Sequence, residues 1–129
     1  MPSKNHHQPS TLHALTRQLF MSAGAPRHIA ESIAQALIND PEYMVRIAAV
    51  RKMPPELLPF VRNDPDPEVR AWVARRIDQR ALADLTFDID PLVRREVAAR
   101  LPMEQLPLLA SDSDMRVRFA VAERIAEEA

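Results

Sequence analysis

The sequence predicts an all-α fold: a solenoid of helical repeats without a β-sheet. The first observation is a 24-residue repeat, and the second is apolar residues at helical spacing within each unit. The third is composition, with one glycine against twelve prolines in 129 residues. Scarce glycine argues against tight β-hairpins, and frequent proline marks many sharp helix boundaries.

A Val-Arg pair sets the register of the repeat, recurring every 24 residues without insertion. Positions 4 and 8 residues after the valine are also apolar, and 0, 4 and 8 share one face of a helix. Each unit therefore contains an amphipathic helix. The four pairs are Val45-Arg46, Val69-Arg70, Val93-Arg94 and Val117-Arg118.

The sequence contains signals for both the start and the end of this helix. An acidic residue three positions before the valine is the expected N-cap, because its carboxylate can accept from the amides of the first turn. Pro67 and Pro91 follow two of these caps, at a position that needs no amide partner. Pro54 and Pro102 end two helices near the apolar position 8. The expected caps are Glu42, Asp66, Asp90 and Asp114.

A short apolar segment follows each helix: "PPELLPFV", "QRALADL" and "MEQLPLLA". Pro59 and Pro107 disfavour regular α-helix inside two of them, so a 3₁₀ helix or one α-turn is expected. A leucine-rich repeat with strands has a similar length. It would need an alternating L-x-L strand and an Asn or Cys ladder, which are not present.

The stretches "DPDPEVRAWVARRI" and "MPPELLPFVRNDPDPEVR" resemble the leucine-rich repeat variant family over about residues 36–126. The resemblance implies a strand-free, right-handed superhelix of alternating α- and 3₁₀ helices. The family is also known for a member whose N-terminal cysteines hold a four-iron, four-sulfur cluster. This chain has no cysteine, so the cluster is not transferred and no cofactor is expected.

We expect three segments: a disordered tail at 1–10, an N-terminal helical cap at 11–39, and four repeats at 40–129, the last truncated. The cap reads as two helices, with Leu12, Leu15 and Leu19 on one face of the first and Gly24 at its C-cap. Its sequence keeps the apolar spacing but loses the acidic and Val-Arg signals, as terminal repeats often do.

Composition narrows the classes of function. The net charge is −1, no apolar run approaches a membrane span, and no signal peptide is evident, so we expect a cytoplasmic protein without a membrane partner. The sequence contains no glycine-rich phosphate loop or nucleophile motif, and the paired carboxylates recur as caps. We therefore expect no enzyme and no catalytic, cofactor or metal residue. The histidines His6, His7, His13 and His28 are interpreted as solvated rather than metal-binding.

Two basic columns leave an alternative open. They could grip phosphates in a nucleic acid, or pair with the acidic columns as a structural ladder. The matched acidic columns favour the structural ladder. We therefore do not favour a nucleic acid as the partner, and nucleic-acid binding is the alternative function. The basic columns are Arg46, Arg70, Arg94, Arg118 and Lys52, Arg76, Arg100, Arg124; the acidic columns are the four caps and Asp40, Asp64, Asp88, Asp112.

The function favoured is a non-catalytic scaffold that binds a protein partner, since stacked repeats offer an extended surface. The helical wheel places an apolar strip edged by arginine opposite the buried stripe, with Trp72 on its flank. Scattered exposed apolar residues are the alternative explanation. The face of the short helices, or self-association through the C-terminal repeat, is the alternative placement. The predicted binding residues are Met44, Ile47, Arg75, Leu92, Arg95, Arg116 and Phe119.

Overall fold

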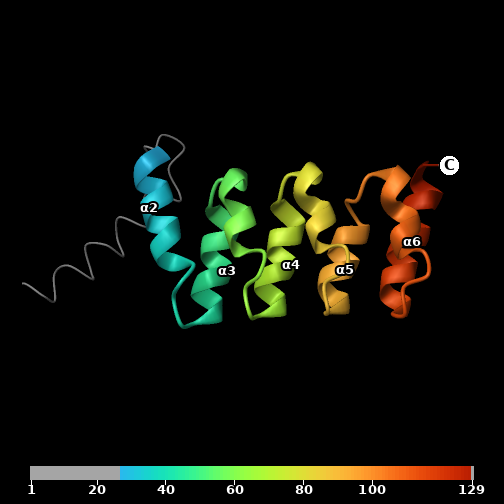
Figure 1. Ribbon diagram of the computed structural model, residues 1–129, viewed down its shortest axis with the longest axis horizontal. Helices are drawn as coiled ribbons and strands as arrows, with labels where there is room; N and C mark the ends of the chain where they lie inside the picture. Colours follow the sequence, from blue (N-terminus) through green and yellow to red (C-terminus); the bar gives the residue numbers. More distant parts are fainter. Residues whose placement is uncertain (1–26, 129) are drawn as a thin grey trace, which may run out of the picture.

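The computed structural model describes residues 27–128, and these form helices, turns and bends without a strand. Its α-helices stand side by side in one row, from α2 at one end to α6 at the other (Figure 1). The all-α repeat prediction is confirmed. The expected tail, the first cap helix and its Gly24 lie outside the described residues.

The first three repeats each pair an α-helix with a 3₁₀ helix, as the sequence predicts. Pro59 and Pro107 lie inside the first and third 3₁₀ helices, whose backbone tolerates them. α6 is the longest α-helix in the described range. In order, the elements are α2 (Arg27–Leu37), α3 (Tyr43–Lys52), η1 (Pro55–Val61), α4 (Pro67–Arg76), η2 (Gln79–Leu85), α5 (Pro91–Ala98), η3 (Met103–Leu109) and α6 (Met115–Glu128).

Three of the four predicted N-caps form. Asp66, Asp90 and Asp114 each accept from the amide two residues later, at 2.8 Å. Glu42 precedes α3 but makes no such bond, which corrects the prediction for this residue. A glutamate carries one more methylene than an aspartate, so its carboxylate fits this short loop less well.

One continuous core runs through the row, from Ala34 on α2 to Val121 on α6. It is built from the valine column and the apolar positions 4 and 8 residues further on, together with two leucine or valine positions of each 3₁₀ helix. The exceptions are Val45, which is only partly buried, and Ile125, which is exposed. Each inner α-helix packs against the α-helix before it and the one after it. The stack is therefore held mainly by contacts between neighbouring repeats.

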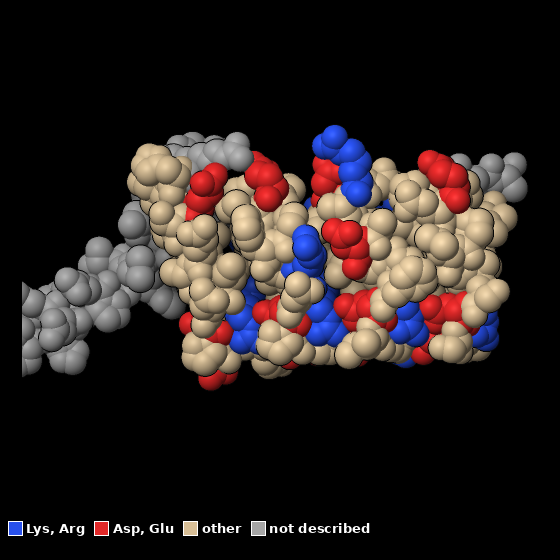
Figure 2. Space-filling view, viewed as in Figure 1, with Lys and Arg blue, Asp and Glu red and all other residues tan. Residues whose placement is uncertain are grey.

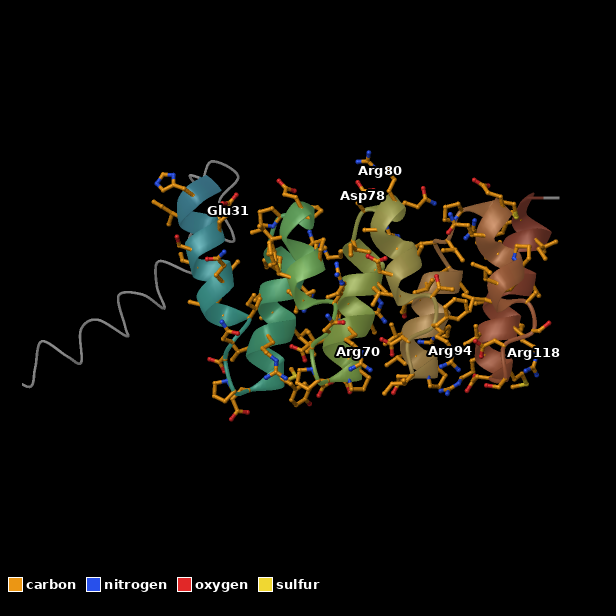
Figure 3. The ribbon with its side chains drawn as sticks, viewed as in Figure 1. Glu31, Arg70, Asp78, Arg80, Arg94 and Arg118 are labelled. Atoms are coloured by element: carbon orange, nitrogen blue, oxygen red, sulfur yellow. The ribbon has the colours of Figure 1, made fainter. Side chains whose placement is uncertain are left out.

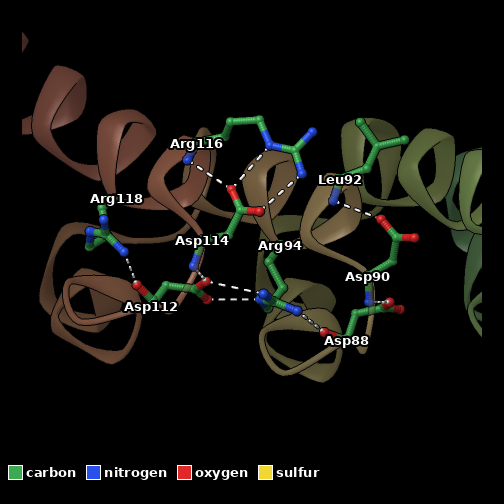
Figure 4. Close-up of polar contacts among 8 residues, drawn as sticks. All are labelled: Asp88, Asp90, Leu92, Arg94, Asp112, Asp114, Arg116 and Arg118. Carbon is green, nitrogen blue, oxygen red and sulfur yellow. Dashed lines mark hydrogen bonds and ion pairs between the residues drawn. The ribbon is translucent and has the colours of Figure 1, made fainter.

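An arginine–aspartate ladder links each repeat to the next. The arginine of the Val-Arg pair binds the aspartate 18 residues later through both carboxylate oxygens: in Arg94, Nε lies 2.8 Å from Oδ2 of Asp112 and Nη2 lies 3.1 Å from Oδ1 (Figure 4). Arg46 with Asp64 and Arg70 with Asp88 repeat this geometry. These side chains are largely shielded from solvent, and hydrogen bonding to Asp112 raises the pKa of Arg94.

The same residues also satisfy the backbone. The third guanidinium nitrogen of Arg94 donates to the carbonyl oxygen of Asp88 at 2.8 Å, and Asp112 accepts from the amide of Asp114 at 2.9 Å. Arg70, Arg94 and Arg118 lie along one edge of the row (Figure 3), where basic and acidic side chains alternate in a band (Figure 2). The structural explanation of the first basic column is thus confirmed for Arg46, Arg70 and Arg94.

Three residues of the second basic column bind backbone carbonyl oxygens at the C-terminal ends of helices rather than the acidic columns, which corrects the expected pairing for Arg76, Arg100 and Arg124. Arg100 donates to the carbonyl oxygens of Ala74 at 2.6 Å and Ile77 at 2.7 Å, in the preceding repeat. Arg76 and Arg124 make equivalent bonds one repeat away on either side. Cationic donors are favourable at a helix C-terminus, where carbonyl oxygens lack partners within the helix. Burial lowers the pKa of Arg76.

We predict that Arg94→Ala lowers the free energy of unfolding by about 1–3 kcal/mol, because the buried Asp112 carboxylate loses its charged donors. Arg118→Ala is the matched control: Arg118 also donates to a carbonyl oxygen but binds no carboxylate among the described residues. Chemical denaturation followed by circular dichroism measures both. Equal effects of the two substitutions would show that the carboxylate pair adds nothing.

We also predict an acid-sensitive contribution at the start of α6. Hydrogen bonds from the Arg116 side chain and amide lower the pKa of Asp114 to about 2, from an ordinary value of 3.8. A depressed folded-state pKa stabilises the protein above about pH 4, and this stabilisation is lost as pH falls toward about 2. Arg116→Ala should flatten the decline in stability in this window, whereas Arg118→Ala should not. Denaturation midpoints across the pH series provide the measurement.

Candidate functional site

A small groove lies between α4 and α5, on the α-helical side of the row. Its volume is about 160 Å³, and it is lined by Glu68, Ala71, Trp72, Arg75 and Leu92. Residues of α4 form most of its wall, and Leu92 contributes the first turn of α5. A concave site of this size accepts one side chain rather than a whole small-molecule ligand, for which a pocket of roughly 300 Å³ or more is usual.

Trp72 is the centre of this site. Its indole lies between two guanidinium groups, with the Arg75 carbon 4.5 Å and the Arg51 carbon 4.9 Å from the ring centroid. Cation–π contact holds such a ring in one orientation. Trp72 is half-buried and packs against the core. The groove therefore presents an aromatic ring in contact with two guanidinium groups.

A carboxylate on α5 fixes one of these arginines. Nη2 of Arg75 donates to Oε1 of Glu96 at 2.8 Å, and this hydrogen bond raises the pKa of Arg75. Arg95 also reaches Glu96, at 3.6 Å. Arg75 remains exposed at the rim, so its guanidinium is positioned yet still accessible. The rim offers a positive charge next to an aromatic and an aliphatic side chain.

The structure brings together only some of the predicted binding residues. Arg75 and Leu92 line the groove, and Arg95 lies beside it through Glu96. Met44 is exposed on α3, and Arg116 and Phe119 are exposed on α6, at the end of the row. Leu92 is half-buried and packs against the core, so it contributes a wall rather than a projecting side chain.

The prediction that Ile47 lies on the binding surface is wrong, because Ile47 is only 8% exposed and belongs to the core. The helical wheel assumed one buried side, but each inner helix also packs against the helix that follows it. Ala71, at the equivalent position of α4, is buried for the same reason. Phe119 occupies that position on α6 and is 63% exposed. The strip is therefore interrupted between Met44 and the groove.

Other exposed apolar side chains lie on the short helices and their turns, a face that the sequence analysis kept only as an alternative. Phe60 and Leu108 occupy equivalent positions of η1 and η3, and a shared exposed column is the signal that could have identified them. Phe87 and Ile89 are exposed in the turn before α5. A shallow depression of about 490 Å³ nearby is lined by Pro55, Glu56, Pro59, Asp78, Arg80 and Ala81.

Neither a metal site nor a membrane-spanning helix is found in the described residues. No group of three or more His, Asp or Glu side chains within residues 27–128 could hold a metal ion. In the same range no helix is long and apolar enough to cross a membrane. His28 is exposed, and the other three histidines lie outside the described residues. The arrangement at Trp72 is suited to binding a side chain of a partner.

No model of a known protein family matches the chain, and neither does any curated protein. A solved structure does match it: a protein described as a leucine-rich repeat variant with a novel repetitive protein structural motif. The sequences are 36% identical, the TM-score is 0.69, and the match covers 78% of this chain. It covers 41% of that protein, so this chain spans less than half of its length.

The comparison and the geometry agree on the repeat. The 24-residue unit, its α- and 3₁₀ helices and the tandem packing were all described above from the chain itself. A match of this identity and TM-score is independent support for the resemblance noted in the sequence. This chain therefore has the fold of that leucine-rich repeat variant.

Proposed function

We propose that this chain is a non-catalytic scaffold that binds a protein partner through the groove at Trp72. The observation that carries this proposal is the indole fixed between Arg51 and Arg75, beside Leu92. Tryptophan and arginine are enriched among residues that dominate protein–protein binding energies, above all in pockets that exclude water. A ring already held in place loses little conformational entropy on binding.

The groove also suggests what the partner presents. Trp72 and Leu92 supply apolar surface to its lining, and Glu68 and Arg75 supply charges of both signs, so an apolar side chain next to a polar group fits it best. Of the residues predicted from sequence, we propose Arg75, Leu92 and Arg95 as the centre of the contact. Met44, Arg116 and Phe119 are exposed farther along the row and would contact only an extended partner. Ile47 is buried and is not proposed.

Nucleic-acid binding is the less favoured function. Arg46, Arg70 and Arg94 are engaged by carboxylates, and Arg76 and Arg100 by carbonyl oxygens of the preceding repeat. Phosphate binding depends on basic groups that can exchange their counterions for phosphates. A ladder already neutralised by aspartate offers few such groups.

A cytoplasmic location and the absence of a cofactor remain expectations from the sequence.

We predict that Arg75→Ala weakens binding of the partner by about 10-fold or more, the loss typical of a residue at the centre of an interface. A photo-crosslinking amino acid at Glu68, an exposed residue that lines the groove, first captures the partner, and titration of the purified partner then gives the affinity. Arg80→Ala is the control, because Arg80 lies on η2 and is fully accessible.

Equal affinities of the wild type and Arg75→Ala for the partner would contradict the groove as the binding site. A loss of affinity seen only with Arg80→Ala would place the binding site on the short helices instead. Retention of the wild-type chain on heparin that weakens steeply with salt would support the nucleic-acid alternative.

A further inference from the structure

Two arginines contact the indole of Trp72, and only one of them is paired with a carboxylate. Arg75 donates to Glu96 at 2.8 Å, so much of its charge is already compensated. Arg51, on the preceding helix α3, lies over the same ring and binds no carboxylate among the described residues. Arg51 is also exposed. It is therefore the cation beside the groove whose charge remains available to a partner.

Contact with the indole leaves the hydrogen-bonding groups of Arg51 available. A guanidinium group is planar and carries five N–H donors in its plane, whereas its attraction to an aromatic ring acts on the face of the ring. A carboxylate can accept from two of these donors at once, in one of the strongest hydrogen-bonded pairs found in proteins. A side chain that already contacts a ring also loses less conformational freedom when a carboxylate binds it.

The repeat itself does not require an arginine at this position. Arg51 and Arg75 stand six residues after the valine of their Val-Arg pairs, where the later repeats have Ala99 and Glu123. The ladder arginines, in contrast, recur in all four pairs. The arginine six residues after the valine thus occurs only on the two helices that contact Trp72. Its role is local to this groove and is not part of the ladder.

Two carboxylates limit where a partner can place negative charge. Glu68 lines the groove from the first turn of α4 and pairs with no cation in the described part of the chain. A second negative charge inside the groove would be repelled by Glu68. Glu96 already occupies the guanidinium of Arg75. Arg51 does not line the groove, so a carboxylate bound there would lie outside it, next to α3.

We propose that the partner carries an acidic residue next to the apolar residue that enters the groove, and that Arg51 binds its carboxylate. This inference rests on the proposed function, because it assigns a second contact to the same partner. The apolar side chain contacts Trp72 and Leu92, and the acidic side chain reaches across the indole to α3. Charge complementarity supports this occupant: Arg51 attracts a carboxylate, and Glu68 disfavours negative charge in the groove.

Trp72 provides the readout, because it is the only tryptophan in the sequence and its fluorescence reports on its own surroundings. A phage-displayed library of short random peptides without tryptophan is selected on the full chain. Selected peptides are synthesised, and titration followed by Trp72 fluorescence gives their affinities. We expect peptides that change this fluorescence to contain an aspartate or glutamate close to an apolar residue. Replacing that acid by its amide should weaken binding about 10-fold.

Arg51→Gln tests which residue binds the acid. This variant should bind the acidic peptide and its amide form equally, because the carboxylate has lost its partner. Lys52→Gln is the matched control: Lys52 is an exposed cation in the same helical turn but is not one of the two cations over the indole. It should retain the preference for the acidic peptide. Circular dichroism checks that both variants keep the fold.

The possible failures are distinguishable. Selected peptides that bind without changing Trp72 fluorescence would contradict the groove as the binding site, and this inference with it. Peptides that change the fluorescence but contain no acidic residue would overturn the inference and leave the groove in place. The same holds if Arg51→Gln retains the preference for the acidic peptide, or if Lys52→Gln abolishes that preference as fully as Arg51→Gln does.

Discussion

The pairing of each ladder arginine with the aspartate 18 residues later is the interaction on which the rest of the structure depends. The α-helices that carry it span only 8 to 10 residues in α3, α4 and α5. Isolated helices of this length are marginal in water, so each one needs its neighbours. Arg70 satisfies this need in one residue: it binds Asp88 in the next repeat and the carbonyl oxygen of Asp64 at the start of its own.

The ladder also fixes geometry that apolar contact alone would leave loose. Valine, leucine and alanine pack in several similar registers, whereas a bidentate arginine–carboxylate pair has one favourable arrangement. Desolvation offsets much of the attraction in a buried ion pair, so its main contribution can be to specificity rather than to net stability. Here the carboxylate of Asp112 also accepts from a backbone amide, which anchors the turn that places α6. Spacing between helices, and hence the groove at Trp72, follows from this register.

Much of this fold could be predicted from sequence because the same structural signals recur in several repeats. The period, the proline boundaries and the aspartate caps recur, so a single atypical unit such as the one opened by Glu42 does not obscure them. The candidate surface was harder to predict. A helical wheel treats a helix as having one buried side, but Ile47 is covered by the following repeat, on a second side. The contact of Arg51 on α3 with Trp72 on α4 depends on spacing between helices, which no single segment encodes.

The most direct test of this account is a double-mutant cycle on Arg70 and Asp88, using Arg70→Ala, Asp88→Ala and the double variant. The free energy of unfolding of each protein comes from urea denaturation. We predict a coupling of about 1 kcal/mol or more, because each residue loses its main charged partner when the other is replaced. Strictly additive effects on the free energy of unfolding, with a coupling near zero, would show that the ladder pairs do not stabilise the stack of repeats.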